Sequence, residues 1–302
     1  YWLGKSYEIL GDKINSEKFF LEGAKFLTTY YGQLSFNEVN NQKDFSFNDE
    51  TFIDKDYQKE FDKNELVNHV LLLQELDATK YTKDIIKHLA TLNIEKGSEV
   101  LAAKLSTKIA RYDFAIQVSK QASYQKRFYN RFNYPIITVP RKVNNKEMPK
   151  PELILAIIRQ ESEFDLKANS YVGARGMMQL MKYTAKLVAK QAKLPYSLSR
   201  LTKDPEYNIK LGSYYFNTLL ENYNGVYPFA IAAYNAGPNR VKTWRKINGD
   251  PSKGQLSYVD WIELIRFKET RNYVQRVLEN ANVYKYMISG SPVKINGFVR
   301  KY

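Results

Sequence analysis

The 302-residue chain contains no cysteine and only two histidines. Without cysteine it can form no disulfide, thiolate nucleophile, iron–sulfur cluster or Cys-ligated zinc site. His69 and His88 each lie in an apolar run with helical spacing, which favours a packing or surface imidazole over a catalytic one. Ser-His-Asp hydrolysis and His-rich metal sites are therefore disfavoured. The chemistry that remains belongs to carboxylates, hydroxyls and amides.

Long apolar runs and targeting signals are also lacking. No stretch approaches the roughly 20 apolar residues of a membrane-spanning helix, so we expect no transmembrane segment. The chain starts at Tyr1 without a methionine or a signal-peptide pattern, which we interpret as a trimmed fragment. The content of 44% apolar and 14% aromatic residues indicates a folded globular protein.

The charged residues are unevenly distributed. The whole chain carries 46 Lys and Arg against 32 Asp and Glu, a net charge of +14. Residues 150–302 hold 24 of the basic and 12 of the acidic residues, and therefore +12 of the excess. We expect the second half to form a separate unit that faces an anionic partner.

Apolar positions recur at helical spacing along most of the chain, and no strand pattern extends beyond a few residues. Helix pairs in the first half are typical of an α-helical solenoid. Pro135 and Pro140 interrupt the helical pattern and indicate a connector. We predict an all-α fold with a helical solenoid domain over 1–140, truncated at its N-terminus, and a second helical domain over 141–302. Helices are predicted at 65–76, 82–92, 96–109, 113–122, 153–162, 177–193, 206–223, 227–236 and 270–287.

Glu161 stands out on physical grounds. Four residues at i, i+3, i+4 and i+7 share one face of the predicted helix: Ile154, Ile157, Ile158 and Glu161. A carboxyl group on a buried face is partly desolvated, which raises its pKa. A raised pKa is what a general acid needs near neutral pH. The alternative is that Glu161 simply ends the helix at its boundary with water.

Four motifs occur in order in the second half: E-S-x-F at 161–164, S-x-x-G-A-x-G-x-M-Q-L-M at 170–181, A-Y-N-A-G-P at 233–238 and E-T-R-x-Y-V at 269–274. Together they resemble the soluble lytic murein transglycosylases, lysozyme-like enzymes that cleave the glycan strands of peptidoglycan. The resemblance covers about 150–286. The first half resembles, more weakly, the end of the helical superhelix that precedes the catalytic domain in long members of this family.

The resemblance implies roles for six residues. Glu161 corresponds to the single catalytic acid, which protonates the glycosidic oxygen and then acts as a base. The other five correspond to residues that bind substrate or support the site, with packing or helix capping as the alternative for each: Ser170 beside the reacting sugar, Gln179 and Met181 in the glycan groove, Tyr234 through its hydroxyl, and Glu269 near the saccharide.

The implied reaction cleaves the β-1,4 bond between N-acetylmuramic acid and N-acetylglucosamine. Ordinary glycosidases need two carboxyl groups. In this family the substrate's 2-acetamido carbonyl stabilises the cationic centre and its 6-hydroxyl attacks C1, which yields a 1,6-anhydromuramyl end. The resemblance implies no metal, no organic cofactor and no nucleic-acid partner. It implies a bacterial enzyme of the periplasm, exported by a signal peptide that is absent from this chain, with anionic peptidoglycan strands as its partner.

Two other functions stay open. A lysozyme-like hydrolase would use the same glutamate but add water, and would release reducing ends. A non-catalytic module could bind a glycan or a polyanion through residues 122–132, where aromatic and basic residues are interleaved. Such a run also fits a helix with one basic solvated side. Two positions depart from the family's pattern, since Lys182 and Arg266 stand where proline is common and each adds a positive charge.

Overall fold

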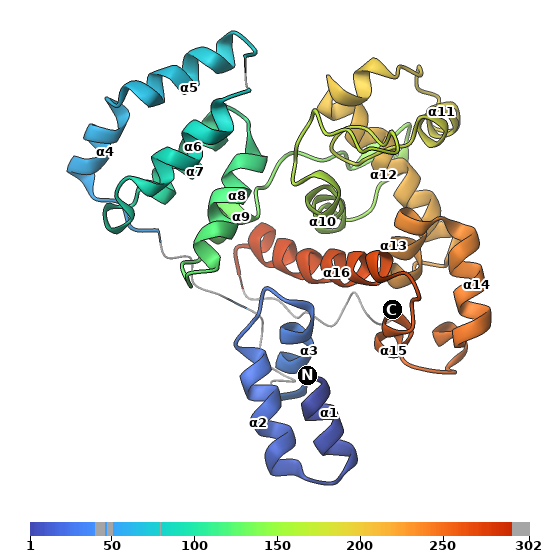
Figure 1. Ribbon diagram of the computed structural model, residues 1–302. Coiled ribbons are helices and arrows are strands. Elements are labelled where there is room, and N and C mark those ends of the chain that lie inside the picture. Colours follow the sequence, from blue (N-terminus) through green and yellow to red (C-terminus); the bar gives the residue numbers. More distant parts are fainter. Residues whose placement is uncertain (40–45, 47–50, 79, 292–302) are drawn as a thin grey trace. The chain divides into compact units, whose positions relative to one another are not determined.

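The computed structural model describes residues 1–39, 46, 51–78 and 80–291. Its regular structure is almost entirely helical (Figure 1), which confirms the predicted all-α class. One small antiparallel hairpin, β1 (Lys142–Val143) and β2 (Lys146–Glu147), was not predicted. The described helices are α1 (Trp2–Ile9), α2 (Lys13–Ala24), α3 (Tyr30–Val39), α4 (Lys55–Asp62), α5 (Glu65–Glu75), α6 (Thr82–Thr91), α7 (Ser98–Lys108), α8 (Tyr112–Ser123), α9 (Asn130–Asn133), α10 (Pro151–Ser162), α11 (Lys182–Gln191), α12 (Pro205–Asn222), α13 (Tyr227–Ala236), α14 (Pro238–Asn248), α15 (Tyr258–Glu263) and α16 (Lys268–Ser289), with short 3₁₀ helices η1 (Ile94–Lys96), η2 (Ser199–Thr202) and η3 (Pro251–Lys253).

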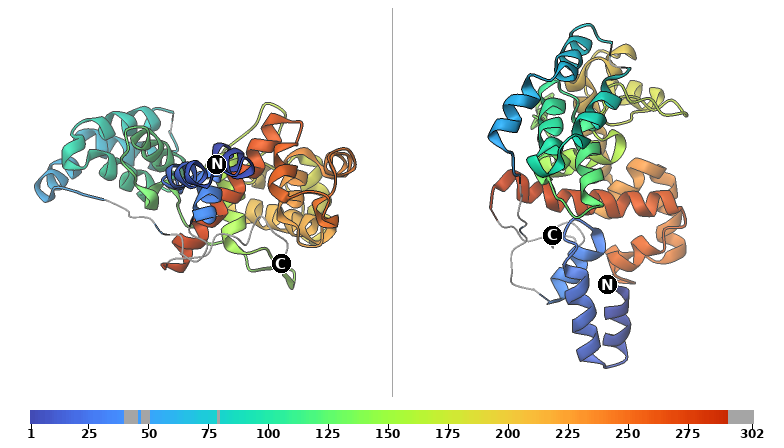
Figure 2. Two further views of the ribbon diagram at one scale, coloured as in Figure 1. Left: turned by 90° about the horizontal axis from the view of Figure 1, so that it is seen from below. Right: turned by 60° about the vertical axis from the view of Figure 1, so that its left-hand side comes forward.

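The chain forms two compact units. The smaller unit comprises Asn48–Ile137 and Ser162–Leu166, and the larger unit comprises Tyr1–Phe47, Thr138–Glu161 and Lys167–Tyr302. Helices α1, α2 and α3 run side by side (Figure 2) and belong to the larger unit, together with the second half of the chain. The boundaries of these units differ from those of the predicted domains, 1–140 and 141–302. The division into those two domains stays a prediction.

Polar contacts explain why α3 groups with α15 and α16. The backbone N–H of Tyr30 donates to the carboxylate of Glu279 at 2.5 Å, and the Tyr31 hydroxyl donates to Glu263 at 2.8 Å. Glu279 is only 3% exposed, and Arg276 also donates to it, at 2.9 Å. A buried carboxylate needs such partners because burial removes its water. The proline-rich connector near 140 gave no indication of these long-range contacts.

The smaller unit is a set of packed helix pairs. Residues at its centre, among them Val70, Leu89 and Ala103, are fully buried. The predicted helices agree with α5, α6 and α8 to within a residue at each end. Helix α7 starts at Ser98, two residues later than predicted, because η1 occupies the preceding turn and Gly97 ends it with φ of 95°.

The core of the larger unit includes α10 and α13. Every residue of α10 from Leu153 to Ile158 is at most 1% exposed. Helix α13 packs against α12, α14 and α16 (Figure 1). Its residue Phe229 meets the buried Trp261 of α15 edge to face, with 4.7 Å between ring centroids. Glu161 follows the buried run of α10, near the end of that helix.

The predicted helix at 177–193 was wrong over its first turn, because α11 begins only at Lys182. Residues 168–181 form a tight loop instead, called here the 168–181 loop. Arg175 pairs through antiparallel bridges with both Asn169 and Leu180. Gln179 adopts a left-handed backbone with φ of 45°, which no α-helix contains.

Asn208 of α12 holds the 168–181 loop in this shape. Its side chain is fully buried and makes three hydrogen bonds. Its Oδ1 accepts from the backbone N–H of Met178 at 2.8 Å, and its Nδ2 donates to the carbonyls of Arg175 at 3.0 Å and Leu201 at 3.1 Å. These bonds give buried backbone groups of Met178, Arg175 and Leu201 the partners that burial requires, so one side chain of α12 stabilises the loop.

Candidate active site

Glu161 is the penultimate residue of α10 and lies on the helix face that buries Ile154, Ile157 and Ile158. The three isoleucines are fully buried, whereas Glu161 is partly exposed. Its carboxyl group therefore lies where the apolar core reaches the surface. Burial raises the pKa of Glu161 from 4.5 to about 7, and the negative charge of Glu269 adds to the rise. The rise in pKa predicted from the helical spacing is confirmed.

Tyr273 makes the closest polar contact with this carboxyl group. Its hydroxyl donates to Oε1 of Glu161 at 2.6 Å, which opposes the rise in the pKa of Glu161 by stabilising the charged form. Burial and the charge of Glu161 raise the pKa of Tyr273 well above 10, so that the hydroxyl stays a neutral donor. The sequence prediction missed Tyr273. A signal was available, because Tyr273 follows Glu269 by one helical turn and shares its face.

Tyr234 and Glu269, both predicted site residues, each interact electrostatically with Glu161. Burial raises the pKa of Tyr234 well above 10, and the charge of Glu161 adds to that rise. The Tyr234 hydroxyl donates to the backbone carbonyl of Met178 at 2.8 Å, so it ties α13 to the 168–181 loop. Glu269 is exposed in the first turn of α16.

The other three predicted residues lie in or beside the 168–181 loop. The Ser170 hydroxyl accepts a backbone N–H four residues further on, at 2.9 Å. The Gln179 amide donates to two carbonyls of its own loop, at 2.8 and 3.2 Å. Met181 is the N-cap of α11 and is 43% exposed. These contacts within the loop agree with a packing role for Ser170 and Gln179, the alternative to substrate binding. The hydrogen bond from Tyr234 to Met178 connects the loop to a residue that interacts electrostatically with Glu161.

Other chemistry finds little support in the part of the chain that the structure describes. No group of three or more His, Asp or Glu side chains there could hold a metal ion. His69 and His88 are both exposed on the smaller unit. Glu163, the next carboxylate after Glu161, forms an ion pair with Lys120 at 2.6 Å. Within the described residues, no helix combines the length and apolar character that crossing a membrane requires.

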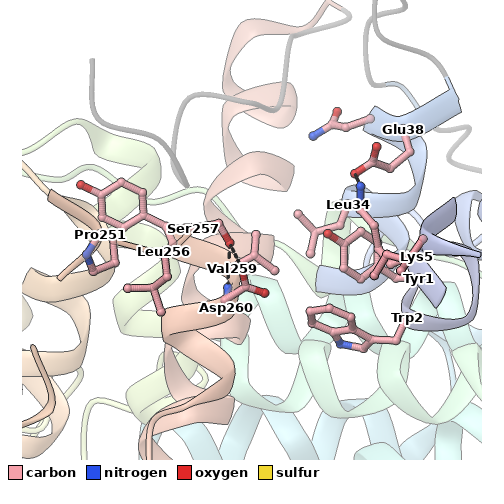
Figure 3. A pocket seen from close by; sticks show the side chains of 13 residues that line it. Tyr1, Trp2, Lys5, Leu34, Glu38, Pro251, Leu256, Ser257, Val259 and Asp260 are labelled. Atoms are coloured by element: carbon pink, nitrogen blue, oxygen red, sulfur yellow. Dashed lines mark hydrogen bonds and ion pairs between the residues drawn. The ribbon is translucent and has the colours of Figure 1, made fainter. Parts of the chain in front are cut away.

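A cavity of about 660 Å³ in the larger unit is lined by none of these residues. It lies between α1 and α3 on one side and the segment from η3 to α15 on the other (Figure 3). Trp2 forms part of its apolar wall. Lys5 pairs with Glu38 at 2.9 Å and Ser257 donates to Asp260 at 2.7 Å, so these polar groups already satisfy one another. We assign this cavity no ligand.

Part of the chain is similar to known sequences. Residues 138–256 match the model of the transglycosylase SLT domain. The soluble lytic murein transglycosylase of Escherichia coli strain K12 is 36% identical over 194 residues, which cover 61% of this chain and 29% of that protein. A putative soluble lytic murein transglycosylase of Haemophilus influenzae is 42% identical over 128 residues, 41% of this chain and 20% of that protein.

Solved structures match over the whole chain. The lytic transglycosylase Slt of Pseudomonas aeruginosa, solved as an inactive mutant, has a TM-score of 0.75 and 27% identity, covering 98% of this chain and 47% of that one. The 70-kDa soluble lytic transglycosylase of Escherichia coli shares the fold, with a TM-score of 0.81, 24% identity and coverage of 100% of this chain and 48% of that one. The fold of these structures agrees with the match of residues 138–256 to the transglycosylase SLT domain.

The match to that domain and the similarity to soluble lytic murein transglycosylases confirm the resemblance that the four motifs predicted. The chain spans about half the length of the solved structures and less than a third of the curated relatives that it matches.

Proposed function

We propose that this protein is a peptidoglycan lytic transglycosylase that cleaves the β-1,4 bond between N-acetylmuramic acid and N-acetylglucosamine. The observation that carries the proposal is the carboxyl group of Glu161, whose pKa is raised to about 7 and which accepts a hydrogen bond from a buried tyrosine. A pKa near the working pH suits a group that must first give and then take a proton. The names of the relatives, all murein transglycosylases, support the same substrate.

In the first step the protonated Glu161 donates its proton to the glycosidic oxygen as the bond from that oxygen to C1 breaks. The glutamate becomes a carboxylate, and the hydroxyl of Tyr273 is already placed to donate to it at 2.6 Å. A preorganised donor lowers the barrier because it needs no rearrangement as charge develops. Tyr273 thus stabilises the carboxylate and fixes its orientation.

In the second step the 6-hydroxyl of the muramyl residue attacks C1, and the Glu161 carboxylate accepts its proton. This closes the 1,6-anhydro ring and restores the protonated glutamic acid without consuming water. The 2-acetamido carbonyl of the substrate takes the role that a second carboxylate has in ordinary glycosidases. Such a mechanism fits a site in which Glu163 is engaged by Lys120 and Glu269 is exposed.

The other predicted residues would act by shaping the substrate groove. Tyr234 supports the 168–181 loop by its bond to the Met178 carbonyl. That loop contains Ser170 and Gln179 and ends at Met181, whose side chain is exposed. We assign Met181 and the exposed Glu269 to glycan contacts. We also propose that the protein acts in the periplasm, and that its basic second half attracts the anionic strands of the wall.

The products distinguish this function from a lysozyme-like hydrolase. Digestion of purified sacculi should release fragments that end in 1,6-anhydromuramyl residues, because the 6-hydroxyl replaces water as the nucleophile. Mass spectrometry separates these ends from hydrated reducing ends by the mass of a water molecule. Fragments with reducing ends alone would show that the site is a hydrolase.

Turnover should also depend on pH through Glu161. Since the first step needs the protonated acid and the pKa is about 7, kcat/KM should fall about tenfold for each pH unit above that value. Tyr273→Phe removes a donor that stabilises the carboxylate, so the pKa of Glu161 should rise and the alkaline limb should move to higher pH. The rate on the acidic side should fall by about tenfold, because the developing carboxylate loses its hydrogen bond.

The pH profiles of both proteins, measured between about pH 5 and 9, check this prediction. A variant that is slower but keeps the alkaline limb of the wild type would show that Tyr273 has only a structural role.

A further inference from the structure

Several arginines of this protein lie over aromatic rings, and one of them differs from the others. In three of these stacks the same arginine also donates to a nearby aspartate: Arg111 over Phe114 with Asp113, Arg200 over Tyr207 with Asp204, and Arg245 over Phe229 with Asp250. Arg240 of α14 lies over Phe267 at 5.0 Å from the ring centroid, yet within the described residues it has no acidic partner. Among the described residues, Arg240 therefore has the aromatic ring of the other stacks but not their carboxylate partner.

Stacking prepares a guanidinium group for one kind of ligand. The ring covers the flat face of the group, while the N–H donors point outward in the plane and match the two oxygens of a carboxylate. Holding the group in place beforehand reduces the entropy lost on binding. Arg111, which lies over Phe114, shows the completed arrangement, because its Nε and Nη2 donate to the two oxygens of Asp113, at 2.9 and 2.7 Å.

The surroundings of Arg240 add positive charge. Phe267 is 44% exposed and is supported by Trp244, whose ring meets it edge to face at 5.4 Å. Arg266 and Lys268 flank Phe267 in sequence, are both exposed, and form no ion pair with any residue that the structure describes. We call Arg240, Arg266, Phe267 and Lys268 the Arg240 cluster.

The Arg240 cluster adjoins the candidate active site along the chain. Phe267 is the N-cap of α16, whose start lies beside α14 (Figure 1). Glu269, in the first turn of the same helix, raises the pKa of Glu161 through its charge. A ligand held by the cluster would therefore lie close to a glycan strand bound at Glu161.

We propose that the Arg240 cluster binds a carboxylate on a peptide stem of the peptidoglycan strand, an inference that rests on the proposed function. The peptide stems hang from the lactyl groups of the muramyl residues, next to the bond that is cleaved, and they carry free carboxylates. Arg240 forms the paired hydrogen bonds, and Arg266 and Lys268 contribute charge. The cluster makes the enzyme prefer strands that carry peptides over bare glycan.

The test compares two substrates, glycan strands with their peptide stems and the same strands after an amidase has removed the stems. Arg240→Gln should lower the ratio of kcat/KM for stem-bearing strands to kcat/KM for bare strands by about fivefold, the upper end of the range for one exposed ion pair, because the stacked guanidinium is held in place beforehand. Most of the change should come from KM, since the contact is distant from the reacting atoms. Arg240→Lys should restore only part of the ratio, because lysine keeps the charge but cannot bind in the paired geometry.

Lys242→Gln is the matched control. It removes the same charge from α14 at a position about 200° around the helix from Arg240, and should leave the ratio unchanged. Thermal unfolding of each variant checks that the fold is intact. An unchanged ratio in Arg240→Gln, or an equal fall in Lys242→Gln, would overturn the proposal.

A binding measurement separates this proposal from the proposed function. Affinity for the two kinds of strand is measured in a Glu161→Gln background, with and without Arg240→Gln. A selective loss for stem-bearing strands supports the Arg240 cluster even if the wild type forms no anhydromuramyl ends, in which case only the proposed function fails. Equal affinities in the two proteins would overturn the cluster's role whatever products the wild type makes.

Discussion

Glu161→Gln should reduce the release of soluble fragments from purified sacculi by about a thousandfold, within the range that a general acid contributes. Glutamine has the shape of glutamate and can still accept the hydrogen bond from Tyr273, so the site should keep its geometry. It cannot donate a proton to the leaving oxygen in place of the carboxylic acid. The loss should therefore appear in kcat, while binding to sacculi in a sedimentation assay stays close to that of the wild type.

Glu163→Gln serves as the control for Glu161→Gln. Glu163 lies two residues further along the chain and is already paired with Lys120 at 2.6 Å. Its replacement removes an equal charge but no group of the proposed mechanism, so the rate should change by less than about threefold. Undiminished turnover in Glu161→Gln would refute the role of Glu161. If that variant and the wild type bind sacculi equally and neither cleaves them, the non-catalytic binding module would be the better description.

Gly176→Ala should cause the largest loss of stability among simple substitutions in the 168–181 loop. Gly176 has φ of 74°, a left-handed conformation that costs free energy for alanine. A Cβ at this position would also overlap the carbonyl oxygen of Leu201 and the amide of Asn208. Strain and overlap together should lower the free energy of unfolding by about 3 kcal/mol and displace the loop, with a loss of turnover. Urea unfolding followed by circular dichroism measures the change.

Gly173→Ala separates the two contributions. Gly173 also has a positive φ, 90°, but no atom lies within 4 Å of the position that its Cβ would take. This variant should show the backbone strain alone, about 1 kcal/mol. Equal losses in the two variants would contradict the view that the close approach of Leu201 and Asn208 fixes the loop.

Local patterns predicted helix α10 well. The apolar spacing around Glu161 depends only on α10 itself, and the burial of Ile154, Ile157 and Ile158 follows directly from it. The ordered motifs similarly predicted the match to the transglycosylase SLT domain, because they depend on residue identity along the chain rather than on packing.

Long-range contacts explain what was missed. The contact between Tyr273 and Glu161 joins residues 112 positions apart, which no local pattern encodes. The 168–181 loop has helix-forming residues in its second part. However, the buried side chain of Asn208, on α12, forms hydrogen bonds with the backbone of Met178 and Arg175 in this loop. The contact of Tyr30 with Glu279, 249 positions away, likewise explains why α3 joins the larger unit.

In the proposed mechanism one glutamic acid cleaves the strand without water. The most direct test is mass spectrometry of the chain ends released from purified sacculi by the wild type and by Glu161→Gln under the same conditions. We predict 1,6-anhydromuramyl ends from the wild type and almost no released ends from the variant. Hydrated reducing ends from the wild type, or anhydromuramyl ends released equally fast by the variant, would contradict the account.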